Sequence, residues 1–195
     1  MSEFDGCRTN EAGLNDPIDK RLSAMIIPRH QSRAMNNHEK GGFAIGNTKV
    51  RVLVTGEQTS TRYAITESTY GPGTGVGPHR HLSFSEVNIV AEGQLQGEID
   101  GKPFSSSPGD VAIIPKGALH NVENGSAEKP VTFISIYSPA GMDEYFNKLA
   151  RGLETGQLAH GGREALQKEY GVVFEGPFFH EESGRSSTGT SLLKS

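Results

Sequence analysis

Three histidines and one glutamate have the residue types and spacing of a metal-binding site. His79, His81 and Glu86 lie close together in the sequence, and His120 follows in a separate segment. Three imidazoles and one carboxylate are a complete ligand set for a divalent first-row metal. They leave one or two positions open on a five- or six-coordinate ion, as is typical of catalytic rather than structural metal sites. We therefore predict an active-site metal held by these four residues.

The donor set narrows the choice of metal. The single cysteine, Cys7, is remote from both histidine segments, so no thiolate lies near the site in the sequence. This argues against a thiol-rich structural zinc site and against copper(I). We expect iron first, with manganese, nickel, cobalt, copper(II) and zinc as alternatives that the sequence does not separate. A purely structural ion is the competing interpretation.

The spacing of the ligands predicts how the chain brings them together. Side chains two apart on a strand share a face, which places His79 and His81 together. Glu86 lies an odd number of residues beyond His81, so the chain must bend between Leu82 and Ser85. We expect Gln94–Ile99 to form the partner strand of the segment that carries Glu86.

His120 is expected to enter the site from yet another strand. Asp100-Gly101 predicts a tight hairpin after Ile99, and a further strand begins after Gly109. Ligands from separate strands can meet at one ion only if the sheet curls back on itself. A closed or nearly closed barrel is therefore implied.

Both segments fit the two sequence motifs of the cupin superfamily. The first motif is filled by Gly73, His79, His81, Glu86 and Gly93, and the second by Gly109, Pro115, Gly117, His120 and Asn124. The chain resembles small single-domain cupins of the quercetin-dioxygenase-like group over roughly residues 41–177. The resemblance implies an all-β fold, a double-stranded β-helix or jelly-roll barrel with an N-terminal arm and one or two C-terminal helices. It also implies that His79, His81, Glu86 and His120 are the metal ligands.

The sequence pattern divides the chain into four segments. They are a flexible N-terminal arm at 1–38, the cupin barrel at 39–140, a C-terminal helical extension at 141–182 and a disordered tail at 183–195. In the extension, Met142, Tyr145, Phe146 and Leu149 follow the spacing of an amphipathic helix, which we expect to cover or brace the barrel. A shorter helix is expected from Gly162 until Gly171.

Composition excludes several classes of partner. The 195-residue chain has a net charge of −4 and no basic stripe, which argues against nucleic acid. It has no apolar run near the roughly 20 residues that a membrane span needs, and no secretory signal pattern. A lone cysteine cannot form an internal disulfide. We expect a cytoplasmic protein, and the cupin resemblance makes a homodimer the expected assembly.

Three functions compete for this site. The first is a dioxygenase that acts on a small flavonol- or polyketide-like substrate. In this hypothesis the metal binds the enol or phenolate oxygen of the substrate, and Glu86 accepts the proton of that hydroxyl group. O2 then attacks the activated carbon. The second is a non-redox isomerase, cyclase, lyase or dehydratase, with Glu86 or Tyr63 as the proton shuttle. The third is a small-molecule-binding module without catalysis.

Five residues are predicted to contact the substrate: Tyr63, Phe84, Asn88, Phe133 and Tyr137. Phe84, Phe133 and Tyr137 would wall an aromatic molecule. Strand parity sends Asn88 inward beside Glu86, where we expect it to hydrogen-bond a ligand. The alternative is a polar residue on a wet face of the barrel.

Overall fold

The computed structural model describes residues 43–158, 161–176 and 179–181. All of them belong to the unit Asn37–Ser195, and the first unit is Met1–Asn36. The predicted arm at 1–38 and the predicted tail at 183–195 therefore lie outside the described residues. No helix in the described part of the chain combines the length and the hydrophobicity that crossing a membrane requires.

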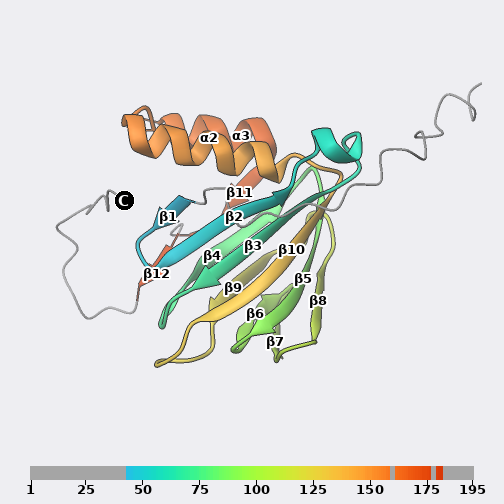
Figure 1. Ribbon diagram of the computed structural model, residues 1–195, viewed down its shortest axis with the longest axis vertical. Coiled ribbons are helices and arrows are strands. Elements are labelled where there is room, and N and C mark those ends of the chain that lie inside the picture. Colours follow the sequence, from blue (N-terminus) through green and yellow to red (C-terminus); the bar gives the residue numbers. More distant parts are fainter. Residues whose placement is uncertain (1–42, 159–160, 177–178, 182–195) are drawn as a thin grey trace, which may run out of the picture. The chain divides into compact units, whose positions relative to one another are not determined.

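Two antiparallel sheets face each other and enclose the core (Figure 1). Sheet 1 has the strand order β1 (Phe43–Ile45), β2 (Thr48–Val54), β3 (Ala64–Tyr70), β10 (Val131–Ser138), β5 (Ser85–Glu92) and β8 (Val111–Ile114). Sheet 2 has the order β11 (Val172–Phe174), β4 (Thr74–His81), β9 (His120–Asn124), β6 (Leu95–Ile99) and β7 (Lys102–Ser106), and β12 (Phe179–Glu181) also pairs with β4. This arrangement confirms the predicted all-β jelly roll.

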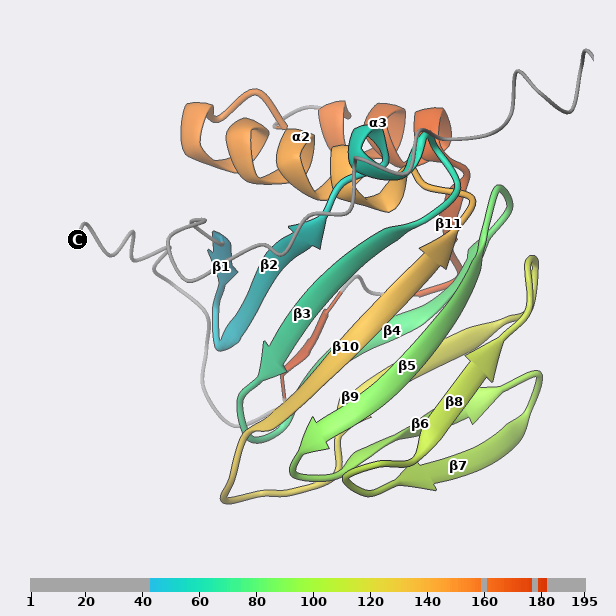
Figure 2. The same cartoon turned by 45° about the vertical axis from the view of Figure 1, so that its right-hand side comes forward.

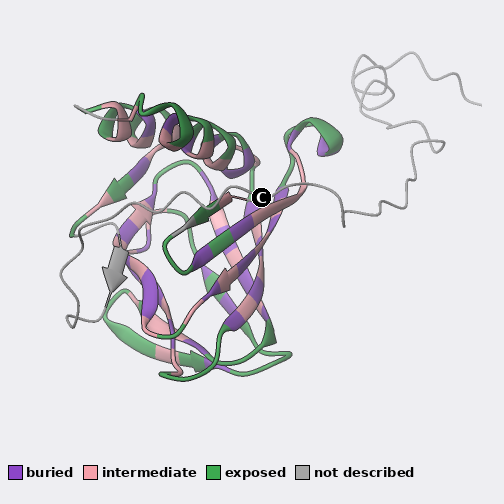
Figure 3. Cartoon of the chain, turned by 60° about the vertical axis from the view of Figure 1, so that its left-hand side comes forward, coloured by how far each residue is buried: buried purple, intermediate pink, exposed green. Residues whose placement is uncertain are grey.

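The strands alternate buried and less buried residues because one face of each sheet points into the core (Figure 3). In β10, for example, Phe133, Ser135 and Tyr137 are buried, whereas Ile134 and Ile136 are only half-buried. One apolar cluster fills the space between the sheets: Tyr70, Val90, Leu95, Ile114, Ala118, Val122, Val131 and Phe133. The period-two pattern of the sequence thus determines which side chains form the interior.

The predicted pairing of Gln94–Ile99 with β5, the strand that carries Glu86, is wrong. β6 pairs with β7 and β9 in sheet 2, whereas β5 pairs with β10 and β8 in sheet 1. The chain changes sheets at Gly93, which has a φ of 78° and lies against the carbonyl of Pro130. A Cβ at this position would come within 2.5 Å of that oxygen. A glycine here permits the sharp turn that carries the chain away from β5.

Two predicted turns are confirmed. Asp100 and Gly101 both have positive φ, at 48° and 74°, as a two-residue type I′ hairpin requires, and they join β6 to β7. The bend between Leu82 and Ser85 is a crossover between the two sheets, because β4 ends at His81 and β5 begins at Ser85. This crossover brings Glu86 round to face the histidines.

Two helices follow the last barrel strand, as predicted, and lie at one end of the sheets (Figure 2). They are α2 (Met142–Thr155) and α3 (Gly162–Tyr170), which ends at Gly171 with a φ of 67°. The buried face of α2 carries Met142, Tyr145 and Leu149. These side chains join a second apolar cluster, whose other members are Phe84, Tyr137, Leu166 and Val172. The helices therefore cover the barrel, and sheet 1 and sheet 2 both contribute to the cluster beneath them.

Asp143 fixes the start of α2. Its buried carboxylate accepts hydrogen bonds from the backbone N–H of Gly56 at 2.8 Å and of Gly141 at 3.2 Å. Removing the acceptor in Asp143→Ala leaves both donors unpaired, so we expect the free energy of unfolding to fall by about 1–3 kcal/mol. Urea unfolding measures this loss. The exposed Glu154→Ala on the same helix should change stability by less than about 0.5 kcal/mol, and an equal effect of the two variants would contradict the assignment.

Candidate metal centre

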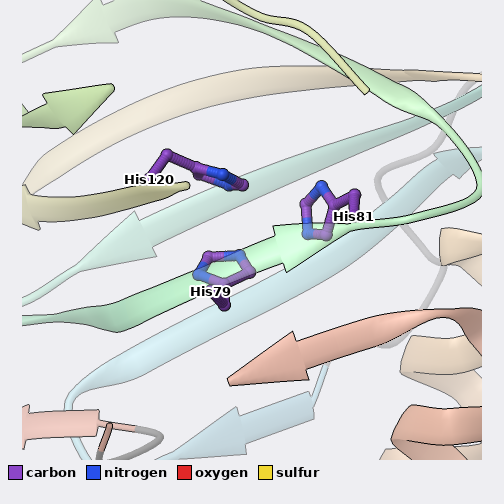
Figure 4. Close-up of side chains that lie close together, drawn as sticks. All are labelled: His79, His81 and His120. Atoms are coloured by element: carbon purple, nitrogen blue, oxygen red, sulfur yellow. The ribbon is translucent and has the colours of Figure 1, made fainter. Parts of the chain in front are cut away.

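The three histidines of the two motifs meet inside the barrel (Figure 4). His79 and His81 lie on β4, and His120 lies on β9 directly across from His79. All three are buried, and one ring nitrogen from each lies within 4.8 Å of those of the other two. Metal–nitrogen bonds of roughly 2.0–2.1 Å can form across such a separation after small side-chain rotations. The barrel thus preassembles three nitrogen ligands.

Backbone carbonyls hold two of the rings in place. Nδ1 of His79 lies 2.8 Å from the carbonyl oxygen of Gly77, and Nδ1 of His120 lies 3.1 Å from that of Ala118. A carbonyl can only accept, so each Nδ1 must carry the proton and donate. In the neutral ring, Nε2 is then the unprotonated nitrogen that can bind a metal.

The buried nitrogens that remain give a direct test of whether the site fits a metal. Nε2 of His120 and both ring nitrogens of His81 are buried and have no hydrogen-bond partner among the described residues. Leaving a buried polar atom unpaired costs about 1–3 kcal/mol. A divalent cation would satisfy Nε2 of His120 and one of the two nitrogens of His81, and the nitrogen-rich donor set suits a first-row transition metal. The residues present therefore fit the predicted metal.

Glu86 lies beside the histidines. It enters from β5 in the opposite sheet, and its buried Oε2 is 3.3 Å from Nδ1 of His81 and 3.5 Å from Nε2 of His120. These contacts are electrostatic attractions rather than well-formed hydrogen bonds. Burial by itself raises the pKa of Glu86, but the interaction with His120 and the neighbouring His81 and His79 lower it to about 2. The carboxylate is therefore ionised at neutral pH.

The histidines differ in their affinity for protons. Burial, reinforced by the neighbouring imidazoles, lowers the pKa of His79 to about 3. Burial also lowers the pKa of His81, to about 4, although Glu86 opposes this. Burial lowers the pKa of His120 as well, but its contact with Glu86 outweighs this and the net shift is upward. His79 and His81 are thus neutral imidazoles across the physiological range, as a metal ligand must be.

A cavity of about 620 Å³, part of it open to solvent, extends from the histidines towards the helices. Most of its walls are apolar or aromatic. It is lined by Phe43, Thr48, Val50, Ser68, Tyr70, Val76, His79, His81, Glu86, Val122, Phe133, Tyr137, Met142, Tyr145, Phe146, Leu149, Val172 and Phe174. Neither lysine nor arginine is among these lining residues. The ionisable groups on the cavity wall are therefore the carboxylate of Glu86, the imidazoles and the tyrosine hydroxyls.

The predicted substrate-contacting residues are not all on the cavity wall. Phe133 and Tyr137 line it. Phe84 is fully buried behind the wall, with its ring centroid 4.6 Å from that of His81 and 5.6 Å from that of Tyr137, and so supports both rings. Tyr63 does not line the cavity, and its side chain is 40% exposed. The arrangement gives no support to its predicted contact with substrate.

Asn88 is on the inner face of β5, as the strand parity predicts, and is completely buried. It does not line the cavity. Its Oδ1 accepts a hydrogen bond of 2.7 Å from the hydroxyl of Ser135, and its Nδ2 has no partner among the described residues. The hydrogen bond from Asn88 to a ligand remains a prediction. The hydrogen-bond partner that the structure shows is Ser135 on the neighbouring strand β10.

The contact between Asn88 and Ser135 predicts a measurable coupling. Asn88→Ala leaves the buried Ser135 hydroxyl without its acceptor, so we expect a loss of about 1–3 kcal/mol in the free energy of unfolding. Adding Ser135→Ala should recover part of this loss, because the pair is then removed together. Metal content should stay at the wild-type level in both variants. Strictly additive stability changes would show that the two side chains do not interact.

The sequence did not predict several of the residues that line the cavity. Phe174 on β11 stacks on His79, with ring centroids 4.9 Å apart and an interplanar angle of 14°. Phe43 on β1 also lines the cavity and packs against Phe146, with ring centroids 5.8 Å apart. No spacing pattern links these residues to the histidine motifs. The aromatic stripe of α2 was predicted to face the barrel, but not to reach the cavity of the metal centre.

Comparison with known proteins identifies the fold. Residues 66–137 match the protein-family model described as a cupin domain. Over this segment the barrel is similar to a cupin domain. Two solved structures are similar to this chain in fold. One is KdgF from Halomonas sp., at 19% identity and a TM-score of 0.51, covering 57% of this chain and 97% of that one. The other is a predicted oxalate decarboxylase from Thermotoga maritima, at 20% identity and a TM-score of 0.51, covering 55% of this chain and 99% of that one.

These similarities concern the fold of the barrel and not its reaction, because both identities are low. The comparison with curated proteins found no match. The quercetin-dioxygenase-like subgroup therefore remains a prediction from the sequence motifs.

Proposed function

We propose that this cupin is a metal-dependent dioxygenase that acts on a small aromatic or enolic substrate, such as a flavonol or a phenolic polyketide. The observation that carries the proposal is the cavity itself. It places three histidines and an ionised glutamate against walls that are mostly apolar and aromatic. Such a site suits a flat, uncharged molecule that offers one oxygen to a metal.

His79, His81 and His120 would hold the divalent ion, with Glu86 as the fourth ligand or beside it. When bound, the ion would polarise the enol or phenolate oxygen of the substrate and support reaction with O2. In a dioxygenase, O2 supplies both oxygen atoms and takes its electrons from the substrate, so no external reductant is needed.

Glu86 is the proposed proton acceptor. Its carboxylate is ionised at neutral pH and is therefore free to accept a proton, and its burial keeps water from competing for the charge. A substrate hydroxyl placed near the ion would lie within reach of Oε2, which is already 3.3–3.5 Å from the histidine nitrogens. General-base assistance of this kind contributes roughly a hundredfold to ten-thousandfold to a rate.

The aromatic walls would select and orient the substrate. Phe174 and Phe133 provide ring faces and edges, and α2 supplies Tyr145 and Phe146 at the helical end of the cavity. Tyr137 adds one polar group: burial and the charge of Glu86 raise the pKa of its hydroxyl, so the phenol stays protonated and can donate a hydrogen bond. A charged sugar or phosphate would find no lysine or arginine among the lining residues.

An oxygen-electrode assay tests the proposal. The purified protein is reconstituted with iron, manganese, nickel, cobalt, copper or zinc in turn, and metal content is measured before each assay. We expect O2 uptake with at least one flavonol or phenolic polyketide and one metal. Absence of uptake across the panel in fully loaded protein would refute the dioxygenase.

The same ligands would also serve a non-redox metal enzyme that uses Glu86 as its base. Strict anaerobiosis separates the two chemistries. A dioxygenase stops when O2 is removed, whereas an isomerase, cyclase, lyase or dehydratase continues at the same rate. Binding of substrate to the loaded protein without any turnover would instead indicate a binding module.

A further inference from the structure

The cavity wall carries three hydroxyl-bearing side chains in addition to the groups at the metal centre. They are Thr48, Ser68 and Tyr70, which line the cavity and are each buried, with no more than 5% of the residue exposed. Thr48 lies directly opposite Tyr70 on the neighbouring strand, and Ser68 precedes Tyr70 on the same face of β3. The three residues are therefore neighbours in the sheet, and we call them the hydroxyl site.

The hydroxyl site is separated from the metal centre along β3. Tyr70 is the last residue of this strand, at the end of sheet 1 that lies away from α2 and α3 (Figure 2). Glu86 pairs across the sheet with Tyr137, and Tyr137 pairs in turn with Ala64 at the start of β3. Ser68 follows Ala64 on the same face, roughly 13 Å farther along the strand at about 3.3 Å per residue. A ligand that contacts both Glu86 and Ser68 must therefore be longer than one aromatic ring.

The hydroxyls of this site are not used by the fold. No hydrogen bond within the described part of the chain involves any of the three, and the bond at Tyr70 is made by its backbone carbonyl, which accepts from Nδ2 of Asn124 at 3.0 Å. The buried hydroxyl of Ser135 on β10 differs, because it donates to Asn88 at 2.7 Å. A buried polar group without a partner is costly. The hydroxyl site therefore calls for a partner from within the cavity.

The chemistry of the hydroxyl site favours a neutral oxygen as this partner. A hydroxyl can both donate and accept a hydrogen bond. Burial, together with the charge of Glu86, raises the pKa of Tyr70, so its phenol stays protonated and can donate. The edge of its ring packs against Phe133, with ring centroids 5.0 Å apart and an interplanar angle of 84°, which fixes its direction. A carboxylate or an ammonium group would be buried here without an opposite charge beside it.

We propose that the hydroxyl site binds a second oxygen of the substrate, a neutral hydroxyl or carbonyl group remote from the oxygen that faces the histidines. This inference rests on the proposed function and narrows its substrate class to molecules of two or more rings that carry oxygen at both ends. Phe133, which lies beside Ser68 across the sheet, also lines the cavity and would contact the rings between the two ends. An analogue without the second oxygen would leave the hydroxyls unpaired and bind more weakly.

Titration calorimetry of the full-length, metal-loaded protein without O2 tests the hydroxyl site. One probe is a flavonol whose only hydroxyl lies next to its carbonyl, and the other is the same flavonol with one added hydroxyl on its pendant phenyl ring. One net hydrogen bond changes affinity roughly two- to tenfold. Because the added hydroxyl can meet more than one group of the site, we expect the wild-type protein to bind the second probe at least about fivefold more tightly.

Two conservative variants connect this preference to the hydroxyl site. Tyr70→Phe and Ser68→Ala each remove one hydroxyl, and each should lower the preference for the second probe while the affinity for the first stays within about twofold of wild type. The double variant should show no preference. Thr69→Val is the matched control, because Thr69 lies between the two residues on the opposite face of β3, where its hydroxyl meets that of Thr132 at 3.2 Å. It should retain the wild-type preference.

Urea unfolding adds a readout that does not depend on the probes. Tyr70→Phe should be as stable as the wild type, because no group of the protein bonds to the missing hydroxyl. A marked loss of stability would show that this hydroxyl has a structural partner, and would count against the proposal. Circular dichroism verifies that each variant is folded.

Three binding results would overturn the hydroxyl site: equal affinity of the wild type for the two probes, failure to bind either probe, or a preference that survives in the folded double variant. The test is separate from that of the dioxygenase. O2 uptake without a preference between the probes would refute the hydroxyl site alone, and a preference without O2 uptake would refute the dioxygenase alone.

Discussion

His120→Ala is expected to remove the metal and, with it, the activity. His120 is the one motif histidine that β9 contributes, and its Nε2 lies 3.5 Å from Oε2 of Glu86. Without it, His79 and His81 remain on a single strand and can provide only part of the ligand set. Loss of a residue that merely supports a ligand lowers metal affinity by roughly 10–100-fold, so loss of a ligand should exceed this.

Elemental analysis of the purified variant and O2 uptake after reconstitution measure the effect of His120→Ala. We expect metal content below a tenth of the wild-type value and turnover reduced in proportion. His38→Ala is the control, because His38 lies outside both histidine motifs. Circular dichroism should show a retained fold in both proteins. Wild-type metal content and turnover in His120→Ala would refute the proposed centre.

Glu86→Gln is expected to separate chemistry from metal binding. Glutamine has nearly the same size and shape as glutamate but cannot accept the substrate proton. If Glu86 is the base, kcat should fall by roughly 10²–10⁴-fold. The three histidines remain in place, so the variant should keep more metal than His120→Ala does. The ratio of turnover to bound metal is therefore the quantity to measure.

Glu169→Gln is the matched control for Glu86→Gln, because Glu169 is an exposed carboxylate paired with Lys148 on the helical surface. It should leave the turnover per bound metal unchanged. If Glu86→Gln loses metal and activity in equal proportion, Glu86 is a ligand and not the base. If it keeps both, Glu86 has neither role.

The grouping of the three histidines could be predicted from the sequence because these residues sit at fixed spacings on short strands. The two-residue alternation places His79 beside His81 and turns Glu86 and Asn88 inward. The same alternation bears on Tyr63, which comes directly before β3. Tyr63 is an odd number of residues from the buried Tyr70, so the alternation places it outward, and it is 40% exposed. Its contact with substrate stays a prediction.

Other features are not encoded locally. The assignment of β6 to sheet 2 depends on the turn at Gly93 and on long-range pairing with β9, neither of which an alternating pattern specifies. The stacking of Phe174 on His79 joins residues far apart in the sequence. Such contacts follow from packing of the whole domain. Hydrophobic patterning predicts that a residue is buried, but not which neighbour it meets.

The cavity has two kinds of wall with different origins along the chain. The histidines and Glu86 come from the barrel strands β4, β5 and β9. Many of the ring faces come instead from β1, α2 and β11, which precede or follow the matched segment 66–137. Substitutions in these flanking elements can reshape the space for a ligand while the candidate metal ligands stay unchanged. Selectivity and reactivity can therefore evolve separately on this scaffold, through different exchanges of residues.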